Sequence, residues 1–156
     1  MKKSSPQDMV LTAEDISMIC ETMFTISKHP YELREKKDRL LCIALNQDHE
    51  PLNIELVHTG PINVDTIRPP DILRVPLAKE AANVVLVHET PGDDISLSMP
   101  EGPFLFWLMQ ACLIMKTPLL EYLVIGGEHY FSFKESGLMD EWTDGNPYNE
   151  LFTSED

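Results

Sequence analysis

Residues 83–88 read NVVLVH, and no polar side chain interrupts the run between Asn83 and His88. A strand with one face in water alternates apolar and polar side chains, whereas a strand buried on both faces is apolar throughout. We therefore expect residues 83–88 to form a strand at the centre of a sheet that is covered on both sides.

Other strands are predicted on either side of this run. Residues 39–46 (RLLCIALN) and 52–58 (LNIELVH) read as strands joined by the turn-like QDHEP, which indicates a hairpin. Residues 119–126 (LLEYLVIG) and 130–133 (YFSF) read as two more strands around a Gly-Gly turn. Together these segments supply enough strands for one sheet.

Three segments have the pattern of helices. Residues 69–82 read as a helix that Pro76 must kink or restart, and residues 98–116 read as a helix whose first turn tolerates a proline. The alternation of helices and strands predicts an α/β fold of three layers (αβα), with a mixed central sheet and helices on both faces. The first helix begins at a capping pair, Thr12 and Asp15, and continues in an apolar face of Ile16, Ile19, Cys20, Met23 and Ile26.

The chain has the size and apolar content of one compact domain, with 156 residues of which 43% are hydrophobic. We divide it into an N-terminal helix and linker (1–35), a core domain (36–139) and an acidic tail (140–156). The tail has no basic residue, so we expect it to be loosely docked at most. Its acidic residues are Asp140, Glu141, Asp144, Glu150, Glu155 and Asp156.

Net charge, cysteine spacing and the length of the apolar runs argue against nucleic-acid binding, a disulfide framework and a membrane span. A net charge of −14 opposes binding to the phosphate backbone, so nucleic acid is not an expected partner. Cys20, Cys42 and Cys112 lie far apart and form no CxxC pair, which indicates reduced thiols. The longest apolar run is too short to span a bilayer, and no signal peptide is evident. We expect a cytoplasmic protein without a membrane anchor.

His88 opens the segment HETPGDDISLSMPEG, which carries a distinctive pattern. His88, Pro91, Asp93 and Ser98 match a family motif that reads histidine-x-histidine, then Pro-Ser-Gly-Asp, then Ser-x-x-Asp at a helix start. On this basis the chain resembles the RadC-like branch of the JAB/MPN/JAMM metallopeptidase-fold family. The similarity extends through ELVHTGPIN and LLEYLVIGGEHYFSFKESGL, and it covers about residues 36–139. The resemblance implies the JAB/MPN (cytidine-deaminase-like) architecture.

The resemblance also implies a zinc site, but this chain departs from the family at most of its positions. Asp38 matches the upstream glutamate that acts as the base in the family, and Ser98 matches the loop serine. Thr90 matches the second histidine ligand and Glu101 matches the aspartate ligand, so only His88 is unchanged among the ligands. In the later strand, the family's Asp-His pair is replaced by Glu121 and Tyr122.

These departures predict weak or absent zinc binding. Catalytic zinc needs three good protein ligands and one open position for water, and the hydroxyl of Thr90 is a poor replacement for an imidazole. Asp38 is one methylene shorter than the family base, which places it more than ~1 Å farther from the water it would activate. A rearranged ligand set is the alternative, and its candidate donors are His58, Glu89, Asp93 and Asp94.

Each of these residues also has a structural interpretation. Ser98 and Glu101 have the spacing of a capping box, in which both side chains satisfy free helix N–H groups. His88 can be an imidazole at a strand end that is hydrogen-bonded to a loop. The Asp93–Asp94 pair fits a solvated turn.

The helix at residues 104–115 has no polar face. RadC-like relatives usually have polar side chains where this chain has Leu105, Phe106, Trp107 and Met109, so we expect an exposed apolar patch there. Such a patch predicts self-association or a protein partner. The alternative is intramolecular cover by the first helix or by Trp142, Tyr148, Leu151 and Phe152 of the tail.

The sequence thus favours a non-catalytic RadC-like JAB/MPN protein that acts as an interaction or scaffold module and needs no cofactor. The competing hypothesis is a zinc-dependent peptidase or isopeptidase that uses His88, Glu101 and a third ligand, with Asp38 as base. DNA repair is suggested only by the RadC family name, and the net charge opposes it.

Overall fold

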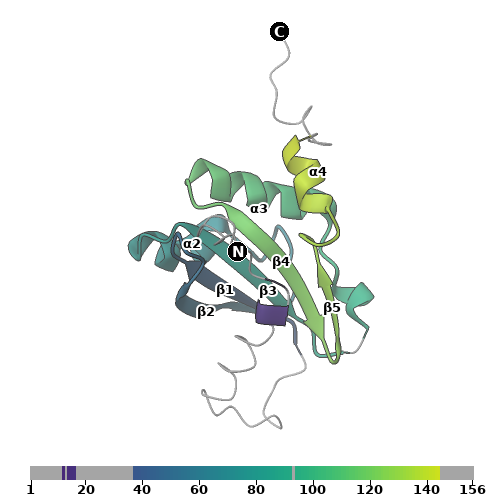
Figure 1. Cartoon of the computed structure of the whole chain (residues 1–156). Helices are drawn as coiled ribbons and strands as arrows, with labels where there is room; N and C mark the ends of the chain where they lie inside the picture. Colours follow the sequence, from purple (N-terminus) through teal and green to yellow (C-terminus); the bar gives the residue numbers. More distant parts are fainter. Residues whose placement is uncertain (1–11, 13, 17–36, 93, 145–156) are drawn as a thin grey trace, which may run out of the picture.

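The computed structural model describes residues 12, 14–16, 37–92 and 94–144 (Figure 1). Its sheet has five strands in the order β2-β1-β3-β4-β5. The strands are β1 (Arg39–Leu45), β2 (Pro51–Thr59), β3 (Asn83–Glu89), β4 (Leu119–Gly126) and β5 (His129–Ser132). The helices are α2 (Pro69–Ala78), the 3-10 helix η3 (Ile95–Ser98), α3 (Gly102–Ile114) and α4 (Leu138–Asp144).

The sheet is mixed, and the predicted central strand lies at its centre. β1 pairs antiparallel with both β2 and β3, which confirms the predicted hairpin. β3 pairs parallel with β4, and α3 forms the crossover between these two strands. Residues 84–87 of β3 are all buried, as an apolar strand without alternation predicts.

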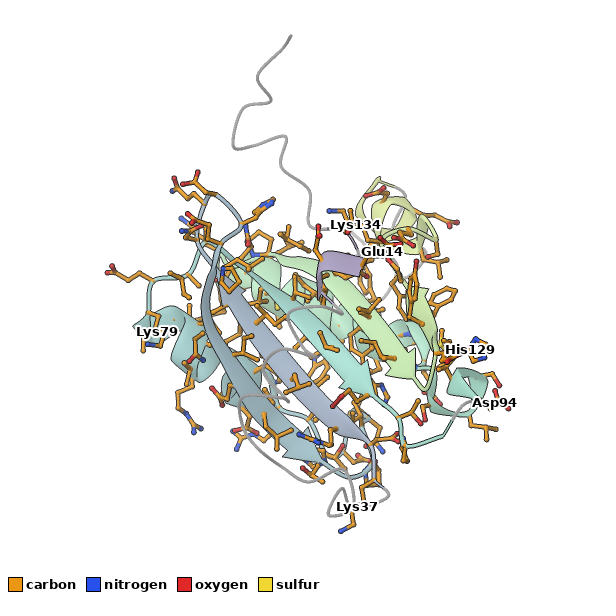
Figure 2. The ribbon with its side chains drawn as sticks, turned by 60° about the horizontal axis from the view of Figure 1, so that its bottom comes forward. Glu14, Lys37, Lys79, Asp94, His129 and Lys134 are labelled. Carbon is orange, nitrogen blue, oxygen red and sulfur yellow. The ribbon has the colours of Figure 1, made fainter. Side chains whose placement is uncertain are left out.

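Both faces of the sheet bury apolar side chains. Leu40 and Cys42 of β1 point toward α2 and α3, whereas Leu41 and Ile43 point to the opposite face. Ile16 joins the cluster on that second face and is fully buried. Figures 1 and 2 show α2 and α3 on one side of the sheet and the helical segment 14–16 on the other. The predicted three-layer α/β architecture is confirmed.

The start of the first helix has the predicted cap. The N–H of Thr12 donates to Asp15 Oδ2 at 3.1 Å, and the N–H of Asp15 donates to Thr12 Oγ1 at 3.1 Å. The reciprocal bonds satisfy two free donors. Ile19, Cys20, Met23 and Ile26, which were expected on the same helical face, lie outside the described residues.

The helix expected from residue 98 begins later than predicted. α3 begins at Gly102, and Ser98 is instead the last residue of the 3-10 helix η3. Pro100 explains the difference, because a residue before proline avoids helical backbone, and Met99 has an extended ψ of 129°. The predicted Ser98–Glu101 capping box is therefore wrong: Glu101 occupies the N-cap position of α3 without a side-chain cap bond.

The expected exposed patch on α3 is also wrong in its placement. Leu105, Phe106 and Met109 are 0%, 1% and 5% exposed, and Trp107 is partly buried against the same cluster. A helix that is apolar all round carries no sequence signal for which side faces water. Phe133, Leu138 and Met139 pack into the cluster that includes these side chains. The exposed large apolar side chains of this region lie at the C-terminal end of α3, at Leu113 and Ile114, and at its C-cap Met115.

α4 crosses the boundary drawn between the core and the acidic tail at residue 140. Met139 is buried in the core, and the helix continues to Asp144. The side chain of Trp142 and the whole of residues 145–156, including Tyr148, Leu151 and Phe152, lie outside the described residues. Within the described part of the chain, no helix is both long and apolar enough to span a membrane.

Candidate functional site

His88 lies at the end of β3, between Asp38, which precedes β1, and Tyr122 of β4. Its Nε2 lies 3.1 Å from Asp38 Oδ2, and its Nδ1 lies 3.0 Å from the Tyr122 hydroxyl. The rings of His88 and Tyr122 meet edge to face, with centroids 6.0 Å apart. Both imidazole nitrogens therefore have a hydrogen-bond partner inside the protein.

Burial affects the protonation states of His88 and Tyr122. His88 is 2% exposed and Tyr122 is 0% exposed, whereas the Asp38 side chain is a quarter exposed. Desolvation lowers the pKa of His88 below its ordinary value, although the hydrogen bond and the charge of Asp38 oppose this shift. Desolvation also raises the pKa of the Tyr122 hydroxyl, which keeps it protonated.

A neutral His88 can form hydrogen bonds with both Asp38 and Tyr122 in only one tautomer. An ionised carboxylate accepts hydrogen bonds and donates none, so His88 Nε2–H donates to Asp38. The lone pair of His88 then lies on Nδ1, where it accepts the hydrogen bond of the Tyr122 hydroxyl. The proton on one nitrogen and the hydroxyl at the other leave no free lone pair on the imidazole.

Thr90 and Ser98, two other residues singled out in the sequence, form a contact of their own. The hydroxyl of Ser98 donates to Thr90 Oγ1 at 2.9 Å. Gly126, at the end of β4, allows the loop that carries them to pack closely, because an added Cβ there would lie 2.6 Å from Gly92 O and from Thr90 Cγ2. The loop that carries metal ligands in the family is thus held by a hydroxyl pair and a close backbone contact.

Two other candidate carboxylates, Asp94 within this loop and Glu101 after it, lie at the N-caps of η3 and α3. Glu101 is exposed at the N-cap of α3. Asp94 is exposed at the surface (Figure 2), and its side chain accepts hydrogen bonds from the backbone N–H and the hydroxyl of Ser96. These bonds lower the pKa of Asp94 and cap η3. Asp93 lies outside the described residues.

The remaining candidates for a rearranged ligand set do not converge on His88. Glu89 follows His88 on β3, so its side chain points to the opposite face, where it lies 3.9 Å from Arg39 Nε. His58 of β2 and His88 of β3 both pair with Leu40 of β1, which lies between them. Two strand spacings of about 4.8 Å each therefore separate their backbones. Within the described residues, no group of three potential ligand side chains forms a metal site.

The donor set therefore does not fit the zinc centre that the resemblance implies. His88 has no free lone pair, the Thr90 hydroxyl is a weak donor engaged with Ser98, and Glu101 lies at a helix start. The structure does bring Asp38 and His88 together, as their matching to the family base and ligand implies. It makes a hydrogen-bonded triad of Asp38, His88 and Tyr122 in place of a ligand cluster.

The role of Tyr122 was missed in the sequence, although the departure from the family at this position was visible. Nothing in sequence spacing links residue 122 to residue 88. The link follows from the parallel register, in which Leu86 is opposite Tyr122 and His88 is opposite Val124, so that positions 88 and 122 face the same side. The neighbouring Glu121 is likewise buried, and it accepts hydrogen bonds from the Ser132 hydroxyl and from the N–H of Lys134.

Comparison with known sequences agrees with the fold described above. The sequence model of the RadC-like JAB domain matches residues 10–138, and the chain belongs to this family. The match begins at residue 10 and therefore includes most of the segment before the core domain. The three-layer architecture described above is accordingly that of the JAB/MPN fold.

Several curated relatives are named UPF0758 protein. The one from Pelodictyon phaeoclathratiforme is 30% identical over 105 residues, which are 67% of this chain and 47% of the relative. The one from Aquifex aeolicus is 29% identical over 105 residues, covering 67% and 46% of the two chains. The one from Methanosarcina mazei is 24% identical over 111 residues, covering 71% and 48%. The chain spans about half the length of these relatives.

Proposed function

We propose that this chain is a non-catalytic RadC-like JAB domain protein that acts as an interaction or scaffold module. The observation that supports this most directly is the triad, in which Asp38 and Tyr122 use both nitrogens of His88. In this proposal the position of the family zinc ligand has become a structural cross-link between β3, β4 and the segment before β1.

Zinc binding at His88 would require a rearrangement of this cross-link. A metal at Nδ1 would displace the Tyr122 hydroxyl, and a metal at Nε2 would displace Asp38 and a proton. A buried polar group left without its partner costs about 1–3 kcal/mol, and neither Thr90 nor Glu101 is placed to offset that cost.

The competing function is a zinc hydrolase of the peptidase or isopeptidase type, with Asp38 as base. One observation favours it: Asp38 lies 3.1 Å from His88 at the position of the family base. In that case Asp38→Ala abolishes a chelator-sensitive cleavage of peptide or isopeptide substrates while the fold is retained. Absence of such cleavage across a substrate panel counts against it.

The metal content of untagged full-length protein tests the proposal. We expect wild-type protein to lose its zinc in competition with a chromophoric chelator, and His88→Gln to behave in the same way. The variant is the matched control, because weak surface binding does not depend on His88. One zinc per chain that survives the chelator in the wild type and is lost in His88→Gln would overturn the proposal.

The proposed contact surface is the solvent-exposed end of the predicted helix 104–115. Ile114 is 77% exposed, and Leu113 and Met115 are also exposed. Exposed apolar side chains in one place favour association with a second copy or a protein partner. Light scattering should give a mass above that of one chain, and Ile114→Asp should lower it. A wild-type protein that is strictly monomeric would contradict self-association.

The environment of the thiols supports a cytoplasmic location. Cys42 and Cys112 are buried free thiols, and burial raises the pKa of Cys112 to about 12. Unpaired thiols of this kind are common in the reducing cytosol. The net charge of −14 makes nucleic acid an unfavourable partner.

A further inference from the structure

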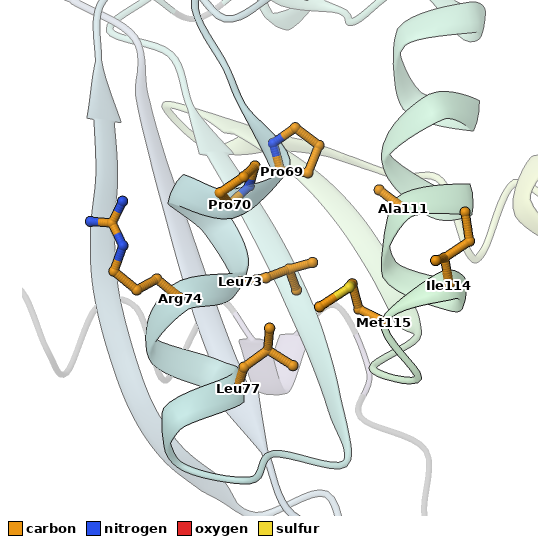
Figure 3. A pocket seen from close by; sticks show the side chains of 8 residues that line it. All are labelled: Pro69, Pro70, Leu73, Arg74, Leu77, Ala111, Ile114 and Met115. Carbon is orange, nitrogen blue, oxygen red and sulfur yellow. The ribbon is translucent and has the colours of Figure 1, made fainter.

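The two ends of α3 differ in how their apolar side chains are covered. Toward its C-terminal end, α3 and α2 form an apolar groove of about 430 Å³ (Figure 3), and Ile114 on its rim is 77% exposed. Toward its N-terminal end, Phe104 and Leu105 are almost fully buried. They belong to the same cluster as Leu138 and Met139 of α4, and Figure 1 shows α4 beside this end of α3. α4 therefore takes part in covering the start of α3.

α4 is a short cover that depends on few contacts. It has seven residues, and an isolated helix of this length is not stable in water. Among its side chains at positions 138–141, Met139 is buried and Leu138 is partly buried, whereas Asp140 and Glu141 are exposed. The position of α4 therefore depends on two apolar side chains and on the turn that precedes the helix.

This turn is built around one buried carboxylate. Glu121 of β4 is 2% exposed, its Oε1 accepts the N–H of Lys134 at 3.1 Å, and its Oε2 accepts the hydroxyl of Ser132. The Ser132 hydroxyl oxygen in turn accepts the N–H of Glu135 at 2.9 Å. Gly137, with a φ of 84° that favours glycine, then leads the chain into α4. Glu121 thus fixes the turn that positions α4.

Burial penalises the charged form of this carboxyl group. Desolvation raises the pKa of Glu121 above its ordinary value, although hydrogen bonds from the turn and the positive charge of Lys134 oppose the shift. Glu135 in the same turn is negative, and so are Glu14 and Asp15 of the helical segment that packs on this face of the sheet. Opening of the turn would return the Glu121 carboxyl to water and its pKa to the ordinary value.

We propose that residues 133–144 form a pH-dependent strap, which closes over the N-terminal end of α3 when Glu121 is protonated and opens more readily when Glu121 is ionised. One buried side chain holds the turn, a glycine stands between the turn and the helix, and two apolar side chains dock the helix. Opening exposes apolar side chains at the start of α3. The strap requires neither a metal nor a partner, so it stands or fails separately from the proposed function.

Protonation is compatible with the closed turn. A protonated carboxyl keeps one oxygen as the acceptor for the N–H of Lys134, and it can donate from the other oxygen to Ser132 Oγ. Because the pKa of Glu121 is raised in the closed state, that state binds more protons than the open state. Closure is therefore fully favoured below the ordinary glutamate pKa of about 4.3, and this advantage is lost as the pH rises through the raised value.

Hydrogen exchange of the full-length chain, followed by mass spectrometry, tests the strap. Protection of residues 133–144 is measured from about pH 5 to about pH 7.5, corrected for intrinsic exchange rates and compared with the protection of β1 and β3. We expect the strap to open separately from these strands, with an opening constant that rises at least severalfold over this range. Glu121→Gln keeps the shape of the side chain without its charge. It should lower the opening constant severalfold at the upper pH and remove the rise.

Two further variants make the result specific. Glu128→Gln removes an exposed carboxylate from the neighbouring β4–β5 turn and should leave the pH dependence of opening unchanged. Ser132→Ala removes the hydroxyl that bonds to Glu121, so it should raise the opening constant at every pH, and it tests the turn even if Glu121→Gln does not fold. Circular dichroism checks the fold of each variant. A segment 133–144 that exchanges only together with the strands would contradict the strap, as would a rise with pH that persists in folded Glu121→Gln or an unchanged opening constant in Ser132→Ala.

Discussion

At the scale of single residues, His88 forms a hydrogen bond with the hydroxyl of Tyr122, whereas the family motif implies a bond from this histidine to zinc. Tyr122 donates to His88 from a fully buried position, at a place where the family pattern has a histidine. The resemblance singled out Asp38 and His88, which lie 3.1 Å apart in the structure. It could not reveal the third partner, since the contact of Tyr122 depends on the strand register and on the length of its side chain.

Tyr122→Phe tests the hydrogen bond directly. The substitution keeps the ring but removes the donor, so the buried Nδ1 of His88 loses its partner. We expect the free energy of unfolding to fall by about 1–3 kcal/mol. Chemical denaturation measures this change. Tyr130→Phe, at an exposed position, is the control and should cost less. Equal effects of the two substitutions would contradict a structural role for the buried hydroxyl.

The stability of the fold should depend on the protonation of His88. Burial lowers the pKa of His88 in the folded state below its value in the unfolded chain. The unfolded state therefore binds more protons at mildly acidic pH, and the free energy of unfolding should fall as the pH decreases from about 7 to about 5. Denaturation at a series of pH values measures the slope, which should be smaller in His88→Gln. A slope that is unchanged in the variant would show that other groups cause it.

At the scale of elements, the strands were predictable and the helix surfaces were not. The apolar runs of β1, β3 and β4 indicate buried strands because both faces of each strand are covered. The apolar residues of α3 give no periodicity from which an outer face can be deduced. The prediction of a patch at Leu105, Phe106 and Met109 failed for this reason.

The contact between the end of β4 and the loop after β3 gives a prediction at this scale. Gly126→Ala would place a Cβ 2.6 Å from Gly92 O, which is backbone, and 2.7 Å from Ile95 Cγ2. We expect a loss of about 1–3 kcal/mol in the free energy of unfolding, because overpacking forces the backbone to shift. Gly92→Ala is the matched control, since its nearest contact would be 3.9 Å away. A thermal melt in which Gly126→Ala is as stable as the wild type would contradict this packing.

At the scale of the whole molecule, the chain has the fold of a RadC-like JAB domain, while the resemblance implies that the residues of the family's metal centre are changed. The fold was predictable because a motif with fixed loop length and several apolar runs specify it together. The state of the site was predictable only in part. The resemblance implies that ligands are replaced, but the hydrogen-bond partners of His88 depend on how three strands are aligned.

Nuclear magnetic resonance of the His88 imidazole tests the central claim most directly. Long-range proton–nitrogen correlation in full-length protein at neutral pH identifies which ring nitrogen carries the proton. The triad predicts the Nε2–H tautomer, with Nδ1 as the hydrogen-bond acceptor of Tyr122, and nitrogen shifts that do not change when one equivalent of zinc is added. A zinc-dependent shift of either His88 nitrogen at stoichiometric metal would contradict the account.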